Sequence, residues 1–212
     1  MRVYYFTSSK HGLDNLRRKR LKISDFTKLN DPFELMGIEV TDRDIRATAK
    51  KYKSTIARSK GLLCFSESKY DPVQWAHYAD VHKGLCLGFD IPDSKLRKIN
   101  YVVKRLATTT LRNPNKLNET LTTKFKHWSY EEEHRLIIDI AAKVSQKGLF
   151  FEDFSDEMSL QEIYIGYQSD LSFSDIKSSY SSVENNVVVK HARPSFKDFR
   201  IVWDQSKKSI HV

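Results

Sequence analysis

The chain has 212 residues, a length that suits one large domain or two small ones, and its content of 40% hydrophobic and 12% aromatic residues is that of a globular and not a disordered protein. Lys and Arg outnumber Asp and Glu by 36 to 27, which gives a formal net charge of +9 and favours a polyanionic partner, nucleic acid first. No run approaches the roughly 18–20 apolar residues of a membrane span and the amino end lacks a signal-peptide core, so we expect a soluble cytoplasmic protein with no membrane partner.

The first part of the chain predicts a strand, a short helix, a turn and a longer helix. Residues 3–7 (VYYFT) have the composition of a strand, and Leu13 and Leu16 anchor the short helix that follows. LNDPFE at 29–34 combines Asn, Asp and Pro, which predicts an extended entry and a tight bend. Thr41 then predicts the N-cap of a helix that runs to about residue 60, with Gly61 as its stop.

The middle of the chain predicts a helix between two buried strands. GLLCFSES at 61–68 and LCLGFDI at 85–91 are the strand patterns. Between them, Asp71 followed by Pro72 predicts a helix start, and Gln74 completes a spacing that resembles a capping box. The helix then places an aromatic stripe on one face and ends at Gly84; the stripe consists of Trp75, Tyr78, Ala79 and His82.

The last part of the chain predicts one more amphipathic helix and a run of strands. Asn113-Pro114 opens the helix, whose buried line is Leu117, Leu121 and Phe125. The strand patterns are WSYEEEHRLIIDI (128–140), EIYIGY (162–167), NVVVKHA (186–192) and FRIVW (199–203), with a polar helix near 173–181. Helices cluster early and strands late, so we expect a single α+β domain whose mixed or mostly antiparallel sheet is flanked by helices.

WSYEEEHR concentrates acids in a basic chain. If it starts a strand, Glu131, Glu133 and Arg135 point to one side, where two carboxylates and a guanidinium form a candidate catalytic site. In that site one acid stabilises or orients, the other acts as a base, and the arginine keeps both ionised. The plain alternative is a helix end, where Glu131 and Arg135 form an ordinary i,i+4 surface pair.

Several other residues are candidates for ligand binding, each with a structural alternative. Trp75, Tyr78 and His82 form a floor for a flat ring or are simply core. Ser66 and Ser68 donate to a ligand or are solvated at a strand end, and Asn30 and Asp31 bind a ligand or shape a turn. Cys64 and Cys86 lie in apolar runs and are expected to be buried free thiols, and no spacing of Cys and His predicts a zinc site.

Two groups of basic residues are candidates for nucleic-acid contact or are solvated faces. The first is carried by the short amino-terminal helix and the second by the longer helix; together they comprise Arg17, Arg18, Lys19, Arg20, Arg46, Lys50 and Lys53. No phosphate loop, nucleophile elbow or dinucleotide-binding glycine pattern accompanies them.

Four motifs in this order resemble a widespread bacterial family of unknown function, and the resemblance covers almost the whole chain. They are LNDPFE, LCFSES, W-x-x-Y-A-x-x-H-x-G-x-C-x-G-F (75–89) and K-x-W-x-Y-E-x-E-x-R (126–135). More distantly, the order resembles that of NAD-dependent ADP-ribosyltransferases of the toxin and phage-defence type. That resemblance implies an ADP-ribosyltransferase-like fold, NAD as a substrate, nucleic acid as the acceptor and an antitoxin or defence-system partner protein.

The resemblance also implies roles for particular residues. The early strand would contact NAD through Tyr4 or Tyr5, the middle strand through Ser66 and Ser68, and the late strand would carry the catalytic Glu133. A carboxylate there stabilises the positive charge that develops on the ribose when nicotinamide leaves. Glu131 would orient or deprotonate the acceptor, and Arg135 would set the ionisation of the acids or bind a phosphate. The early strand lacks the His found in the family, and Arg2 lies at its beginning.

Two other functions are compatible with the same residues. One is a non-catalytic nucleic-acid-binding module in which the acids are structural. The other is a metal-dependent nuclease that uses Glu131, Glu133 and Asp31.

Overall fold

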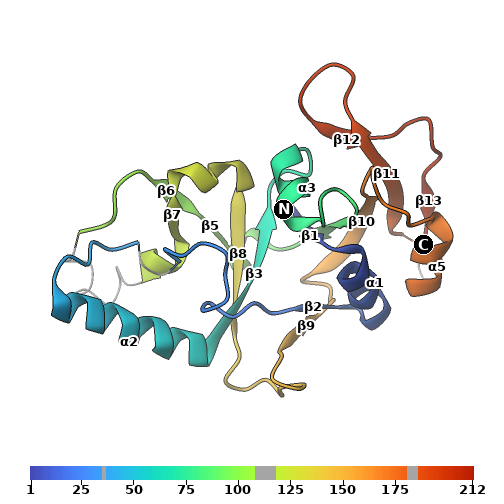
Figure 1. The fold of residues 1–212 in the computed structure, drawn as a ribbon. Helices are drawn as coiled ribbons and strands as arrows, with labels where there is room; N and C mark the ends of the chain where they lie inside the picture. Colours follow the sequence, from blue (N-terminus) through green and yellow to red (C-terminus); the bar gives the residue numbers. More distant parts are fainter. Residues whose placement is uncertain (35–36, 108–117, 181–185) are drawn as a thin grey trace.

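A long twisted sheet forms the centre of the protein (Figure 1). The structure is a computed structural model that describes residues 1–34, 37–107, 118–180 and 186–212. Within these residues the main sheet has nine strands in the order β12-β11-β10-β4-β1-β3-β8-β5, and β13 pairs with β11 outside that path. In the described part of the chain β10 and β11 run parallel and the other neighbours in this sheet run antiparallel.

The strands and helices have the following bounds. The strands of the main sheet are β1 (Arg2–Thr7), β3 (Lys60–Ser66), β4 (Leu85–Asp90), β5 (Leu96–Lys98), β8 (Glu133–Asp139), β10 (Ser159–Ile165), β11 (Val188–Pro194), β12 (Ile201–Trp203) and β13 (Ile210–His211). Two small sheets pair β2 (Arg20–Lys22) with β9 (Phe151–Asp153) and β6 (Asn100–Val102) with β7 (Thr123–Phe125). The helices are α1 (Ser9–Arg18), α2 (Arg43–Ser59), α3 (Pro72–Tyr78) and α5 (Phe173–Ser179), and the 3-10 helices are η1 (Asp93–Lys95), η3 (Asn118–Thr122) and η4 (Lys126–Glu131).

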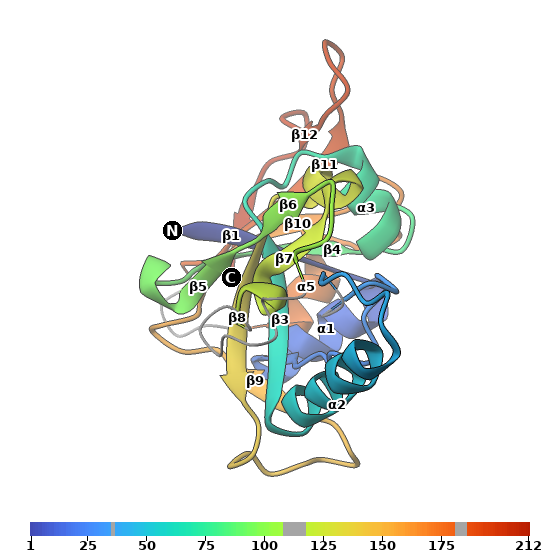
Figure 2. The ribbon, with the colours of Figure 1, turned by 90° about the vertical axis from the view of Figure 1, so that its left-hand side faces the viewer.

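The main sheet divides between β1 and β3. β1 pairs with β4 over its whole length, from Arg2 opposite Asp90 to Thr7 opposite Leu85. It pairs with β3 only where Tyr4 lies opposite Ser66. The two halves of the sheet therefore diverge on either side of this pair, and in Figure 2 β1 lies across the nearly upright β3 and β8.

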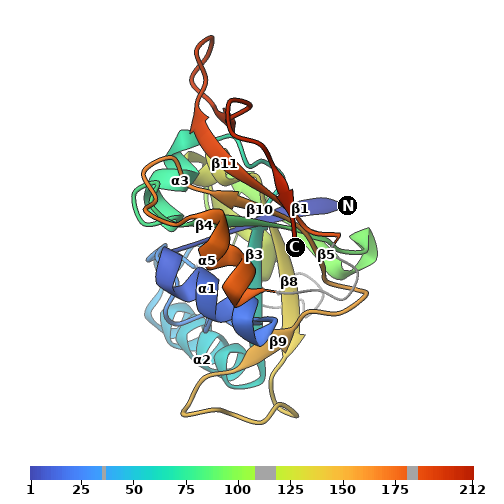
Figure 3. The same cartoon turned by 90° about the vertical axis from the view of Figure 1, so that its right-hand side faces the viewer.

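Alternating side chains of β1 enter two different hydrophobic clusters, as the period of a strand requires. Val3 belongs to the larger cluster, which also contains Leu16 of α1 and Ile176 of α5. Figure 3 shows α1 and α5 on one side of the sheet, and the two helices are in contact. Tyr4 belongs to the second cluster, in which Trp75 of α3 packs against the other side.

The predicted single α+β domain with a mixed, mostly antiparallel sheet is confirmed, and several boundaries differ. Asp42, not Thr41, caps α2, because its carboxylate accepts the amides of Asp44 and Ile45. Gly61 lies inside β3 and does not end α2; a Cβ there would be 2.3 Å from Ile23 Cγ2, so this position requires glycine to pack.

Two further predictions, one of a strand and one of a helix, differ from the structure. η4 precedes β8, so the predicted strand begins at Glu133 and not at Trp128. Of the helix predicted from Asn113, residues 113, 114 and 117 lie outside the described residues; Leu121 is buried in η3, and Phe125 is exposed in β7. Among the described residues, no helix combines the length and apolar character needed to cross a membrane.

Candidate functional site

A cavity of about 260 Å³ opens where β1 and β3 diverge. β1, β3, β8, α3 and the loop before residue 35 contribute its walls. Eight of the residues singled out from the sequence line it: Tyr4, Tyr5, Asn30, Ser66, Tyr78, Glu131, Glu133 and Arg135. The structure thus brings the early, middle and late motifs of the sequence together in one site.

Glu131 and Glu133 both line this cavity, but a turn between them, and not the alternation of a strand, places them on the same side. Glu131 ends η4, and Glu132 adopts a left-handed conformation with a φ of 44° before β8 begins at Glu133. Glu132 is exposed, whereas Glu131 and Glu133 are 5% and 3% exposed. The turn at Glu132 therefore directs the two flanking carboxylates into the protein, and Glu133 and Arg135 then follow the alternation of the strand.

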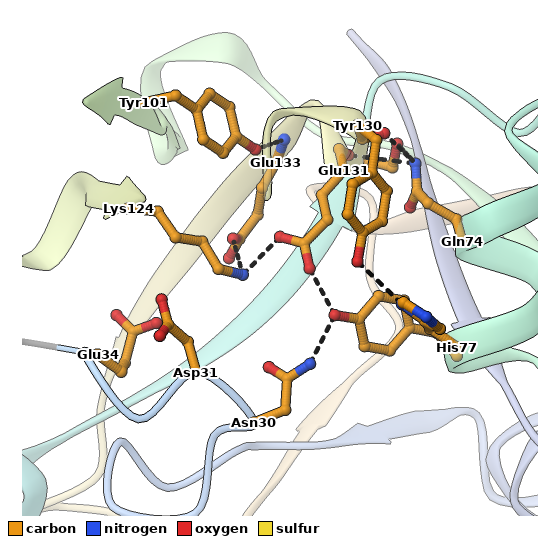
Figure 4. Close-up of polar contacts among 12 residues, drawn as sticks. Asn30, Asp31, Glu34, Gln74, His77, Tyr101, Lys124, Tyr130, Glu131 and Glu133 are labelled. Carbon is orange, nitrogen blue, oxygen red and sulfur yellow. Dashed lines mark hydrogen bonds and ion pairs between the residues drawn. The ribbon is translucent and has the colours of Figure 1, made fainter. Parts of the chain in front are cut away.

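Lys124 of β7 links the two carboxylates. Its Nζ donates to Glu131 Oε2 at 2.5 Å and to Glu133 Oε2 at 3.1 Å, and Figure 4 shows the side chain reaching between the two acids. Lys124 is 6% exposed and lies 4.8 Å from the centre of the Trp128 ring. The neighbouring carboxylates raise its pKa against the effect of burial, so it remains charged.

Arg135 is completely buried and joins Glu133 to Glu34. Its Nε donates to Glu133 Oε1 at 2.7 Å, and its two terminal nitrogens bind both oxygens of Glu34 at 2.6 and 2.9 Å. The terminal nitrogens also donate to the carbonyl of Leu121 and to Glu133 Oε2. These contacts use all five N–H donors of a guanidinium. Arg135 therefore positions and ionises the acids and has no donor left for a phosphate.

The surrounding residues shift the pKa values of Glu131 and Glu133 in opposite directions. Burial raises the pKa of Glu131, and the charge of Glu133 adds to this effect, although Lys124 opposes it. Burial also opposes ionisation of Glu133, but Arg135 and Lys124 outweigh it and lower the pKa of Glu133 to about 2. A pair of carboxyl groups with pKa values displaced in opposite directions is the pattern of a site with one proton-transferring acid and one permanently ionised acid.

Polar groups from α3 and the loop before residue 35 hold Glu131 in place. Tyr78 Oη donates to Glu131 Oε1 at 2.5 Å and accepts from Asn30 Nδ2 at 2.7 Å. Gln74 Nε2 donates to Ser66 Oγ at 2.8 Å and to the carbonyls of Tyr130 and Glu131. The Gln74 side chain therefore ties α3 to β3 and η4 and does not complete the predicted capping box, and the N-cap of α3 is Asp71 as expected.

The structure places the other four candidate ligand-binding residues away from this cavity. Asp31 lines a neighbouring cavity and accepts the amide of Phe33, and Ser68 accepts the amide of Tyr70. Trp75 is 1% exposed, packs edge-on against Phe6 and donates to the carbonyl of Lys69. Trp75 is thus a core residue of the second cluster.

His82 does not extend the helical stripe, because α3 ends at Tyr78. Asp80, Val81 and His82 have φ values of 48°, 50° and 65°, and the His82 ring packs edge-on against Tyr167. The chain turns here because Gly84 fits against β1, where a Cβ would be 2.0 Å from the carbonyl oxygen of Thr7. The stripe therefore contributes only Tyr78 to the cavity.

Four residues that form hydrogen bonds with Glu131, Glu133 or Arg135 were not selected as site residues from the sequence: Glu34, Gln74, Tyr101 and Lys124. Tyr101 Oη accepts the amide of Glu133 at 2.8 Å, which holds the start of β8. Glu34 lies in LNDPFE and Gln74 immediately precedes Trp75, so both are close in sequence to residues already selected. Lys124 shares no pattern with the acids that it binds, and only the fold brings it to them.

The two basic groups lie on different helices, α1 and α2, which are well separated in Figure 1. Arg17, Arg18 and Lys19 are exposed at the end of α1, with Arg18 paired to Asp14. Arg20 instead stacks 3.6 Å over the Phe151 ring and donates to Gln146.

On α2, Lys50 is exposed, and the other two predicted contacts have partners within the protein. Arg46 donates to the carbonyls of Val40 and Thr41, and Lys53 donates to the carbonyl of Glu34. Lys53 therefore helps to hold the loop that supplies Glu34 to Arg135.

The cysteines and the metal-site alternative also have defined positions. Cys86 is buried, Cys64 is half-buried in the cavity wall, and both are free thiols. Burial raises the pKa of both, and Glu133 raises that of Cys64 further, so neither is activated as a thiolate. No group of three or more His, Cys, Asp or Glu residues in the described ranges is placed to hold a metal ion.

Comparison of the chain with protein-family models, with curated proteins and with solved structures gave no match.

Proposed function

We propose that the protein is an ADP-ribosyltransferase that cleaves the nicotinamide–ribose bond of NAD and transfers ADP-ribose to a nucleic acid. The observation that carries the proposal is the pair of buried carboxylates, Glu131 and Glu133, with pKa values displaced in opposite directions at the junction of the two half-sheets. In the ADP-ribosyltransferase-like arrangement that the sequence resembles, the catalytic acid lies on a late strand, and Glu133 begins β8.

The charge balance of the site supports a cationic substrate. In the hydrogen-bonded network three carboxylates, Glu34, Glu131 and Glu133, share two cations, Lys124 and Arg135. When all five groups are ionised the network is one positive charge short. The nicotinamide ring of NAD carries one positive charge, and the ribose acquires it as the ring leaves, so the substrate supplies the missing charge where buried electrostatic interactions are strong.

The proposed reaction assigns one step to each acid. The bond between ribose C1′ and the nicotinamide nitrogen breaks, its electron pair leaves with neutral nicotinamide, and ionised Glu133 stabilises the cation formed at C1′. An oxygen or nitrogen of the acceptor then forms a bond to C1′, and its proton passes to Glu131. The raised pKa of Glu131 suits proton acceptance near neutrality better than that of an ordinary carboxylate.

The size of the cavity limits how NAD binds. At about 260 Å³ it is smaller than the roughly 300–1,000 Å³ of common ligand sites. The nicotinamide and its ribose would occupy it, near Ser66 and Tyr78, and the adenosine half would lie outside. The net charge of +9 on the whole chain would bring a polyanionic acceptor to a site whose own acids would repel one.

The test uses the purified 212-residue chain and NAD labelled in its adenylate half. Nicotinamide release and transfer of label to RNA or DNA support the proposal. Cleavage of nucleic acid with Mg²⁺ and without NAD would instead identify a metal-dependent nuclease. Retention of nucleic acid with neither reaction would identify a non-catalytic binding module.

A further inference from the structure

The hairpin between β11 and β12 projects beyond the rest of the protein at the top of Figures 2 and 3. Its tip, residues 195–200 (SFKDFR), carries Phe196 and Phe199, which are 92% and 98% exposed. These are the two most exposed large hydrophobic side chains among the described residues. The candidate site does not explain why two aromatic side chains are exposed to solvent at the tip of this hairpin.

The tip is held by its own hydrogen bonds. Ser195 Oγ accepts the amides of Lys197 and Asp198, the amide of Ser195 donates to the carbonyl of Arg200, and the amide of Arg200 donates to that of Asp198. The base of the hairpin is attached to the loop before α3, because the amide of Ile201 donates to the carbonyl of Tyr70 at 2.8 Å. The backbone therefore presents both rings in advance of binding, which lowers the entropic cost of binding.

Positive side chains alternate with these rings. The Arg193 guanidinium lies 4.1 Å from the centre of the Phe196 ring, and that of Arg200 lies 4.2 Å from the centre of the Tyr70 ring. Lys197 stands between the two phenylalanines in sequence. The acids of the segment face arginines: Asp198 is 4.0 Å from Arg200, and Asp204 is 3.7 Å from Arg193. From residue 186 to the end, six Lys or Arg residues stand against these two Asp residues.

We propose that this hairpin tip is a binding site for single-stranded nucleic acid. Unpaired bases stack on exposed rings whatever their sequence, and the neighbouring cations bind the phosphates between the bases. A duplex hides the faces of its bases and would leave both rings unused. An acidic membrane surface fits less well, because the tip offers two rings without an aliphatic neighbour and places Asp198 between them.

The position of the tip relates it to the cavity. Tyr70, which contacts both Arg200 and Ile201, is followed by Asp71, the N-cap of α3, and α3 carries Tyr78 into the cavity. The tip therefore contacts the segment that leads directly into α3, the helix that contributes Tyr78 to the cavity, so a single-stranded nucleic acid bound at the tip would be held next to that segment. The claim that the tip binds the acceptor of the reaction rests on the proposed function. The claim that the tip binds single-stranded nucleic acid does not depend on the proposed function.

The experiment measures binding of a fluorescent single-stranded oligonucleotide of about 12 nucleotides at about 50 mM salt, with no NAD. The double variant Phe196→Ala, Phe199→Ala is expected to bind at least about 10-fold more weakly than the parent. Phe196→Tyr, Phe199→Tyr keeps both rings and is expected to bind like the parent. Val144→Ala, which truncates a side chain that is 87% exposed elsewhere on the surface, is the matched control and is expected to change nothing.

Three results would overturn the inference. They are an unchanged dissociation constant in the double alanine variant, absence of binding by the parent, and a loss confined to binding of vesicles that contain acidic phospholipid. Nicotinamide release without an acceptor is measured on the same variants and is expected to be unaffected. If the parent releases no nicotinamide but its binding depends on the rings, the proposed function fails and the hairpin site stands. If nicotinamide is released but nucleic-acid binding does not depend on the rings, the proposed function stands and the hairpin site fails.

Discussion

Glu131 and Glu133 accept hydrogen bonds from the same ammonium group, Lys124 Nζ, at 2.5 and 3.1 Å. The shared cation keeps two buried carboxylates close together without forcing both into the neutral form. Glu133 has Arg135 as a second cationic partner, whereas Glu131 has the hydroxyl of Tyr78. In the proposed reaction this asymmetry makes Glu133 the permanently charged acid and Glu131 the acid that accepts a proton, and each of these roles has a measurable consequence.

Glu133→Gln is expected to lower nicotinamide release from NAD by at least about 100-fold, the scale of removing one principal charge-stabilising group. The substitution keeps the volume and removes the charge facing Arg135 and Lys124, so the free energy of unfolding should fall by about 2 kcal/mol while the protein stays folded. Glu132→Gln is the matched control, because Glu132 is the exposed neighbour of the same type. Equal turnover in Glu133→Gln and Glu132→Gln would contradict the assignment of the charged acid.

The pH dependence of ADP-ribose transfer to the acceptor should report Glu131, which takes the proton of the acceptor in the proposed reaction. Burial raises its pKa above the ordinary 4.5, and activity requires the ionised form, so the rate should fall as the pH drops through a value above 4.5. Tyr78→Phe removes a hydrogen bond that favours ionisation, and the acidic limb should therefore move to higher pH. The control is Tyr167→Phe, an exposed tyrosine outside the cavity, which should leave the limb in place. A limb that does not move in Tyr78→Phe would exclude Glu131 as its source.

Arg135→Gln should be among the most destabilising single changes in the chain. It removes five donated hydrogen bonds and leaves Glu34 and Glu133 buried without their main cation, which costs about 3–5 kcal/mol of unfolding free energy. Arg18→Gln breaks an exposed pair with Asp14 on α1 and should cost less than about 0.5 kcal/mol. Urea unfolding of both variants measures the difference. A cost for Arg135→Gln as small as that of Arg18→Gln would mean that the buried network is not formed.

The exposed end of α1 should contribute to nucleic-acid binding through charge alone. If Arg17 and Arg18 each contact a phosphate, replacing both by Gln should make the plot of log affinity against log salt less steep by about 1.4 for single-stranded nucleic acid. Arg20 is left unchanged because its guanidinium is engaged by Phe151 and Gln146. The matched control replaces Lys95 and Arg97 at the β5 edge, where Lys95 is likewise in an exposed ion pair with an acid. The same slope in the α1 variant and the parent would show that these residues are a solvated face.

The sequence by itself determined the local elements, because each depends on a pattern within a few residues. The strand at 3–7, the helix of Leu13 and Leu16 and the cap at Asp71-Pro72 are all present in the structure. Errors arose at boundaries. Asp42 and not the adjacent Thr41 caps α2, through hydrogen bonds to its own first turn. At the end of α3 the chain leaves the helical path after Tyr78, and Gly84 packs against β1. The aromatic stripe failed at His82 for this reason, since helical periodicity does not indicate where a helix stops.

The tertiary structure alone decided the composition of the site. Arg135 binds Glu34 across 101 positions of sequence, and Lys124 reaches the acids from a strand of a different sheet. It also decided which of the acids is charged, since the pKa of each depends on how many cations the fold brings to it and how completely it excludes water. An ion pair requires only that two side chains lie close together in space, and no periodicity along the chain indicates which distant residues do so. The role of a residue such as Lys124 can therefore be identified only from the folded structure.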